Sequence, residues 1–84
     1  MTRDYVKETF SQKHIQLVSS TDYDDNYLIE GEYSSYCLIF VTDRYISFVI
    51  RNRVTNEERK FGFELRDLAI YGEDMYVKLP YINQ

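Results

Sequence analysis

The sequence has little of what many protein classes need: one cysteine, one proline, three glycines and no tryptophan in 84 residues. The lone Cys37 has no intrachain partner, which excludes a disulfide scaffold. Its longest unbroken apolar run, 37–41, is far shorter than the ~18 residues of a membrane-spanning helix. We therefore expect no membrane partner, and the lack of a basic, then apolar, opening segment predicts a cytoplasmic protein.

The chain is short but well supplied with apolar residues. At this length we expect a single domain, residues 1–84, and 44% hydrophobic residues are typical of a globular chain. Nine tyrosines and five phenylalanines make it rich in aromatic residues. Tyrosine combines a large apolar area with a polar tip, which suits both a small core and a surface that alternates between water and a partner.

The net charge of −4 is unevenly distributed. Between residues 22 and 32 there are five acids and no base: Asp22, Asp24, Asp25, Glu30 and Glu32. Between residues 44 and 60 the bases are Arg44, Arg51, Arg53, Arg59 and Lys60, against Glu57 and Glu58. An acidic surface attracts basic partners and repels nucleic acid, so this pattern favours a basic protein partner.

The order of elements predicts an α+β fold. Thr2 and Asp4 favour the start of a short amphipathic helix over 3–11. Alternating apolar residues and turn signals then predict strands at 14–20, 27–33, 36–42, 45–54, 58–65, 67–71 and 75–79, with 65–71 also compatible with a helical turn. We expect the N-terminal helix to pack on a strongly bent antiparallel meander of about six or seven strands. This outline is similar to that of Sm-like and other small barrels, a resemblance of fold alone.

The positions of the turns predict the strand register. A two-residue turn at Thr55 and Asn56 places Phe48 opposite Phe63, and a tight turn at Asp43 places Ile39 opposite Phe48. The first of these registers also places two bases, Arg51 and Lys60, opposite each other. The predicted core face is Tyr27, Ile29, Cys37, Ile39, Val41, Ile46, Phe48, Ile50, Phe61, Phe63 and Leu65. Gly62 lies inside a predicted strand, which indicates a bulge or close packing.

The opposite face of the predicted sheet is unusually apolar for a surface exposed to water. It carries Leu28, Glu30, Glu32, Tyr36, Leu38, Phe40, Tyr45, Ser47 and Val49. Two interpretations stay open: the face is a second part of the core, or it is exposed and binds a partner.

No group of residues predicts catalysis or a bound metal. His14 and Cys37 are isolated, and the three glycines form no phosphate loop. Asp22, Asp24 and Asn26 match three positions of a calcium loop, but the required glycine and the final glutamate are missing. We therefore expect no cofactor, no metal and no enzymatic activity.

The sequence thus favours a small acidic, non-enzymatic protein-binding module. We expect an inhibitor that occludes a basic surface of a nucleic-acid-processing or toxin enzyme, as anti-defence and immunity proteins of phages and mobile elements do. The expected partner-binding residues are Asp22, Asp24, Asp25, Leu28, Glu30, Glu32, Tyr36, Phe40 and Tyr45. One alternative is a nucleic-acid-binding barrel that uses the hairpin of Arg51, Arg53, Arg59 and Lys60. Another is an adaptor, or a homodimer, that pairs through a sheet edge.

Overall fold

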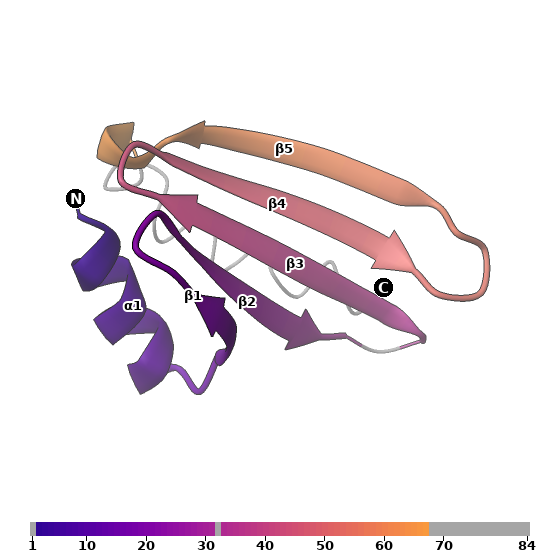
Figure 1. Cartoon of the computed structure of the whole chain (residues 1–84). Helices are drawn as coiled ribbons and strands as arrows, with labels where there is room; N and C mark the ends of the chain where they lie inside the picture. The colour runs from indigo at the N-terminus through magenta and orange to yellow at the C-terminus, as the bar shows by residue number, and fades with distance from the viewer. Residues whose placement is uncertain (1, 32, 68–84) are drawn as a thin grey trace.

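A computed structural model describes residues 2–31 and 33–67, which form one helix on an antiparallel sheet (Figure 1). The elements are α1 (Arg3–Gln12), β1 (Gln16–Ser20), β2 (Asp24–Glu30), β3 (Ser35–Thr42), β4 (Tyr45–Asn52), β5 (Glu58–Glu64) and the short 3-10 helix η1 (Leu65–Asp67). Neighbouring strands in the sequence are neighbours in the sheet, in the order β1-β2-β3-β4-β5. The predicted α+β meander with an N-terminal helix is confirmed.

The described sheet has five strands and is open, because β1 and β5 are its two edges. The expected six or seven strands and the barrel-like shape are not confirmed. Of the predicted strand at 67–71, Asp67 lies in η1, and the rest of it and the strand at 75–79 lie outside the described residues. Leu65 belongs to the 3-10 helix, so the helical turn that the sequence allowed after β5 is present here.

The helix α1 follows the predicted pattern. Thr2 is its N-cap and accepts a hydrogen bond from the backbone N of Tyr5 at 3.2 Å. Val6 and Phe10, four residues apart, are both buried against the sheet. The chain leaves the helix through His14, which has a left-handed φ of 59°. Within the described residues, no helix is long and apolar enough to cross a membrane.

The predicted register is right for one hairpin and wrong for the next. Between β3 and β4, Ile39 lies opposite Phe48, as expected. Between β4 and β5, Phe48 lies opposite Phe61 rather than Phe63, a shift of two residues. Because side chains alternate with a period of two, this shift changes each residue's partner but leaves it on its predicted face.

The cause of the shift is the loop between β4 and β5. The loop spans the five residues 53–57, where a two-residue turn was predicted. The side chain of Asn52 closes it by accepting hydrogen bonds from the backbone N of Val54 at 2.8 Å and of Thr55 at 3.0 Å. Asn56 then adopts a left-handed φ of 61°, which asparagine tolerates better than most residues.

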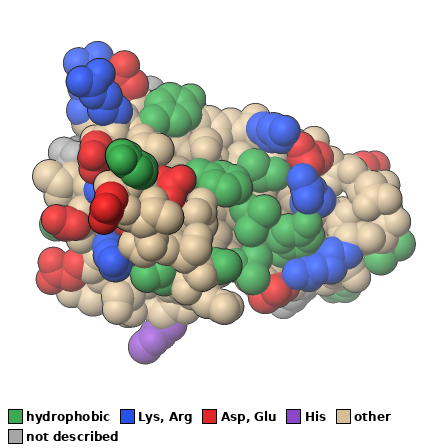
Figure 2. All heavy atoms as spheres, in the orientation of Figure 1, with side chains coloured by type: hydrophobic (Ala, Val, Ile, Leu, Met, Phe, Trp, Pro, Cys, Tyr) green, Lys and Arg blue, Asp and Glu red, His purple; other side chains and the backbone are tan. Residues whose placement is uncertain are grey.

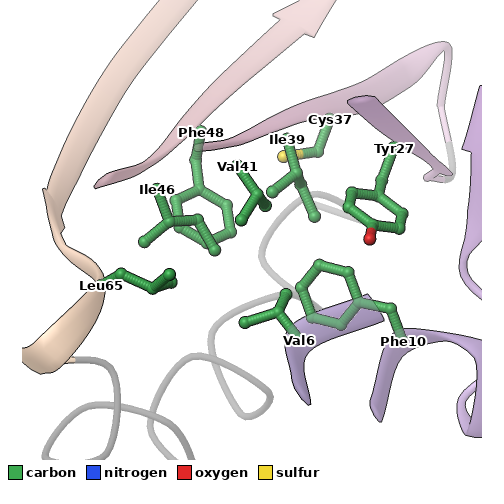
Figure 3. Close-up of a cluster of buried hydrophobic side chains, with 9 residues drawn as sticks. All are labelled: Val6, Phe10, Tyr27, Cys37, Ile39, Val41, Ile46, Phe48 and Leu65. Atoms are coloured by element: carbon green, nitrogen blue, oxygen red, sulfur yellow. The ribbon is translucent and has the colours of Figure 1, made fainter. Parts of the chain in front are cut away.

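The core lies between α1 and the face of the sheet that the sequence predicted (Figure 3). Its buried apolar residues are Val6, Phe10, Tyr27, Cys37, Ile39, Val41, Ile46, Phe48 and Leu65, with Ile15, Ile29, Ile50 and Phe63 partly buried beside them. The prediction is wrong for Phe61, which is 46% exposed because it lies on the edge strand β5. Its ring still stacks on Phe48 with the centroids 4.9 Å apart.

Candidate functional site

The face of the sheet opposite α1, here called the open face, has an apolar centre. Leu28 pairs with Leu38 and Leu38 with Val49, so the apolar positions run across three adjacent strands. Figure 2 shows hydrophobic side chains gathered across the middle of the sheet. Phe40 and Tyr45, on the same face, are 38% and 45% exposed. This part of the face is therefore exposed to solvent. Of the two interpretations left open, a second part of the core is thus wrong for these residues.

The ring of Tyr45 packs on Gly62, a glycine of the neighbouring strand β5. A Cβ atom on Gly62 would lie 2.8 Å from the Tyr45 ring and 2.8 Å from the backbone oxygen of Ile46. The ring therefore lies directly over Gly62, and the close packing expected for this glycine is confirmed. Only glycine leaves room for the ring there, so this position of Tyr45 depends on the missing side chain of Gly62.

A second aromatic side chain of the open face, Tyr36, is fixed by two arginines. The guanidinium of Arg53 lies 4.2 Å from the centroid of the Tyr36 ring, a cation–π arrangement. Arg53 donates two hydrogen bonds to the Glu30 carboxylate, at 2.9 and 3.0 Å. Arg51 donates a hydrogen bond to the Tyr36 hydroxyl at 3.3 Å. The end of the open face near the β4–β5 loop is thus a connected network of paired charges around a tyrosine.

The bases Arg51 and Lys60 do not oppose each other as the sequence predicted. Arg51 lies opposite Glu58, and Lys60 lies opposite Val49. The Glu58 carboxylate lies between the two cations, accepting from Arg51 Nε at 2.9 Å and lying 3.0 Å from Lys60 Nζ. Its hydrogen bond with Lys60, and to a smaller extent that with Arg51, holds the pKa of Glu58 below its ordinary value.

This pairing removes the observation that favoured nucleic acid. Two opposed bases are unfavourable unless an anion lies between them, and the chain's own Glu58 supplies that anion. Arg53 is paired with Glu30. Arg59 is opposite Ile50 on the other face of β5, so the four bases of the hairpin do not form one surface.

The acidic block of the sequence is also divided by the fold. Asp22 lies in the β1–β2 turn and Asp24 begins β2, whereas Glu30 ends β2. At about 3.3 Å per residue, the two ends of this strand are about 20 Å apart. Glu32 lies outside the described residues. The acids with known positions therefore occupy opposite ends of the sheet and do not form one patch.

Asp25, expected among the partner-binding residues, is buried on the core face, with 1% of its surface exposed. Its carboxylate accepts hydrogen bonds from Arg3 Nε at 3.0 Å and Arg3 Nη2 at 3.1 Å, and another from the Ser20 hydroxyl. Burial alone raises the pKa of Asp25, but the hydrogen bonds from Arg3 and then Ser20 outweigh it and hold that pKa below its ordinary value. The expectation of an acidic block without a neutralising base is thus wrong for Asp25, as it is for Glu30.

Asp25 and Arg3 connect the helix to the β1–β2 turn. Arg3, the first residue of α1, also donates hydrogen bonds to the backbone oxygens of Asp22, at 3.0 Å, and of Thr21. The sequence contained a signal for this role: Asp25 and Tyr27 are two residues apart, so they share the core face of β2.

The described residues hold no group of three or more histidine, cysteine, aspartate or glutamate side chains that could bind a metal ion. Cys37 is buried, and its burial raises the pKa of the thiol to about 12. The thiol is therefore protonated and inert at neutral pH.

Comparison with known proteins gives no relative. No protein-family model matches the chain, and neither the curated proteins nor the solved structures include a match. The function is therefore inferred from the chemistry of the surface.

Proposed function

We propose that this protein is a non-enzymatic binding module that docks on another protein through the open face of its sheet. The observation that carries the proposal is the half-buried apolar centre, with the exposed rings of Phe40 and Tyr45 on the same face and paired charges at one end. A contiguous apolar patch with a polar rim is typical of protein interaction sites. Tyrosine and arginine, which surround this centre, are the residues most often found to dominate binding energy at interfaces.

Two aromatic side chains of this face make contacts within the protein itself. Tyr45 packs over Gly62, and Tyr36 lies between Arg51 and Arg53. Binding loses less conformational entropy when its anchor side chains are already fixed. Tyr36 and Tyr45 are therefore proposed anchors, and the exposed ring of Phe40 on the same face is a third.

The partner is proposed to be an enzyme with a basic surface beside an apolar one, whose site the protein occludes. Asp22 and Asp43 lie exposed in the β1–β2 and β3–β4 turns, at the same end of the sheet as Tyr45, and Asp43 also forms an ion pair with Arg3 at 3.8 Å. Carboxylates placed there would steer a basic partner toward the apolar face and stand in for the phosphates of its substrate. We thus still propose the inhibitor function expected from the sequence, with the steering carboxylates at one end of the open face.

The test compares two substitutions that add the same charge. Phe40→Asp changes the centre of the open face, and Val54→Asp changes an exposed residue in the loop 53–57, 76% exposed. Each variant is first checked for an unchanged melting temperature and circular dichroism spectrum. Partners captured from a lysate of the native host by the immobilised wild-type protein are then identified, and the affinity of the purified partner is measured for all three proteins.

We expect Phe40→Asp to weaken binding at least about tenfold, because it places a charge in a desolvated contact. Val54→Asp should bind as the wild type does. Equal affinity of all three proteins for the partner would contradict the proposal. Replacing Asp22 with Lys should lower the association rate at low salt, and an unchanged rate would remove the basic partner from the proposal.

A further inference from the structure

Three bases lie together at one end of the open face, beside its apolar centre. They are Arg51 in β4, Arg53 directly after β4, and Lys60 in β5. Their side chains are 40%, 48% and 69% exposed, so solvent reaches all three cationic groups. Figure 2 shows basic and acidic side chains close to the hydrophobic ones on this side of the sheet.

The same face has aromatic rings that solvent also reaches, those of Phe40 and Tyr45. Phe40 lies opposite Ser47, which is four residues before Arg51 in β4, or about 13 Å from it along the strand. Proteins that bind single-stranded nucleic acid combine cations that follow the backbone with aromatic rings on which the bases stack. The open face thus has both kinds of group, and its bases and rings alone do not exclude such a ligand.

Two carboxylates of the same face occupy the three cations. Glu30, at the end of β2, accepts hydrogen bonds from Arg53 Nη1 at 2.9 Å and Nη2 at 3.0 Å. Glu58, in β5, accepts from Arg51 Nε at 2.9 Å and lies 3.0 Å from Lys60 Nζ. A phosphate that binds at any of these bases therefore has to replace a carboxylate of the chain itself.

We propose that Glu30 and Glu58 determine the specificity of the open face, because they keep single-stranded nucleic acid off a surface that otherwise has the groups to bind it. Nonspecific affinity for nucleic acid arises when free cations neutralise phosphates and release the counterions bound there. A base already paired with a carboxylate only exchanges one anion for another. The inference rests on the function proposed above, since an inhibitor of a nucleic-acid-processing enzyme has to avoid the substrate of that enzyme.

The test removes the two carboxylate charges and measures the binding of a short, fluorescein-labelled oligothymidylate by fluorescence polarisation. Glu30→Gln combined with Glu58→Gln preserves the size of both side chains and frees the three bases. The matched control, Glu8→Gln combined with Glu57→Gln, changes the net charge equally at two exposed positions that do not pair with these bases. Exposed ion pairs contribute little to stability, so both double variants should fold, which melting temperatures and circular dichroism spectra check.

We expect the Glu30→Gln/Glu58→Gln variant to bind the oligonucleotide at least about tenfold more tightly than the wild type at low salt. Each cation that neutralises a phosphate of a single strand contributes about 0.7 to the slope of log affinity against log salt, so three freed bases should give a slope of about 2. The control should bind as weakly as the wild type.

The two single variants keep the test independent of the folding of the double variant. Glu30→Gln frees Arg53 alone and should steepen the salt dependence by about 0.7, whereas Glu58→Gln frees Arg51 and Lys60 and should steepen it by about 1.4. Equal slopes for the two single variants and the wild type would contradict the assignment of these carboxylates.

Three further results would overturn the inference: a folded double variant that binds no more tightly than the wild type, a control that gains as much affinity, or a wild type that already binds as tightly as the double variant. The last would make nucleic acid itself the ligand of the open face. The oligonucleotide assay contains no protein partner, so its failure is distinguishable from failure of the proposed function, which appears as equal affinity of Phe40→Asp and the wild type for the captured partner.

Discussion

Tyr27→Phe is expected to stabilise the protein, although it changes one of the most buried residues of the core. The Tyr27 side chain is 1% exposed, and its ring meets the edge of Phe10 with the centroids 4.8 Å apart. Its hydroxyl is buried and has no hydrogen-bond partner in the described structure. Phenylalanine keeps the ring and its packing and removes only the unpaired hydroxyl.

The expected gain follows from the cost of burying a polar group without a partner. A buried donor without an acceptor costs about 1–3 kcal/mol. We expect Tyr27→Phe to recover about 1–2 kcal/mol of that, and the melting temperature of a domain of this size rises by about 4–8 °C for each kcal/mol. The free energy of unfolding is measured by urea denaturation and the melting temperature by calorimetry.

Two other tyrosines are matched controls for the same substitution. Tyr45 is 45% exposed, so Tyr45→Phe should leave the melting temperature nearly unchanged. Tyr36→Phe removes an acceptor of Arg51 and should lower the melting temperature slightly. A lower melting temperature for Tyr27→Phe would show that the hydroxyl has a partner in the folded protein, and the reasoning would be wrong.

The pH dependence gives a second check on the same group. Burial, and next the charge of Asp25, raises the pKa of Tyr27 to about 12. The hydroxyl ionises at a lower pH in the unfolded chain, near the ordinary pKa of about 10. The wild type should therefore lose stability relative to Tyr27→Phe as the pH rises from about 10 toward 12. Parallel curves for the two proteins over this interval would contradict the burial of the hydroxyl.

Three further substitutions test the packing. Phe48→Ala should cost about 3–5 kcal/mol in urea denaturation, because it empties the centre of the core, and an unchanged melting temperature would refute that placement. Gly62→Ala should lower the melting temperature, because the added Cβ would lie 2.8 Å from the backbone oxygen of Ile46, which cannot move freely. A stability equal to that of the wild type would show that β4 and β5 are farther apart at this point than the structure has them. Asp25→Asn should destabilise the protein at neutral pH, because it weakens the pair with Arg3. The folded-state pKa of Asp25 is lowered, so this stability advantage of the wild type should shrink as the pH falls through that pKa. Melting temperatures of the two proteins that stay equally separated in acid would contradict this.

Alternation along the strands predicted the faces of the sheet more reliably than the turns predicted the partners. Period-two spacing assigned Ile39 and Phe48 to the core and left Phe40 on the other face, as the structure has them. The β4–β5 register depended instead on the length of one loop. The hydrogen bonds that Asn52 accepts make a five-residue loop stable there, and the residue types alone did not distinguish it from the shorter turn.

The charges were harder to predict, because their partners are far away in the sequence. Asp25 is separated by 22 residues from the guanidinium of Arg3, and Glu30 by 23 residues from that of Arg53. A count of acids and bases within a window treats both carboxylates as unpaired. For Asp25 the strand pattern held the missing information, since its position two residues before Tyr27 places it on the core side.

The pairing of charges within the chain determines what kind of partner the open face can attract. Arg53 and Lys60 are each held by a carboxylate of the same chain, so a phosphate or an acidic partner would have to compete with Glu30 or Glu58 for them. Exchanging such a pair for an ion pair with the partner gains little free energy, because exposed ion pairs contribute only about 0–1 kcal/mol and the partner's own charge must be desolvated as well. The favourable free energy of the proposed docking at this face must therefore come from the aromatic and aliphatic centre. It follows that the dissociation rate from a partner should depend on Phe40 and change little with salt, whereas the association rate should carry any salt dependence that Asp22 confers.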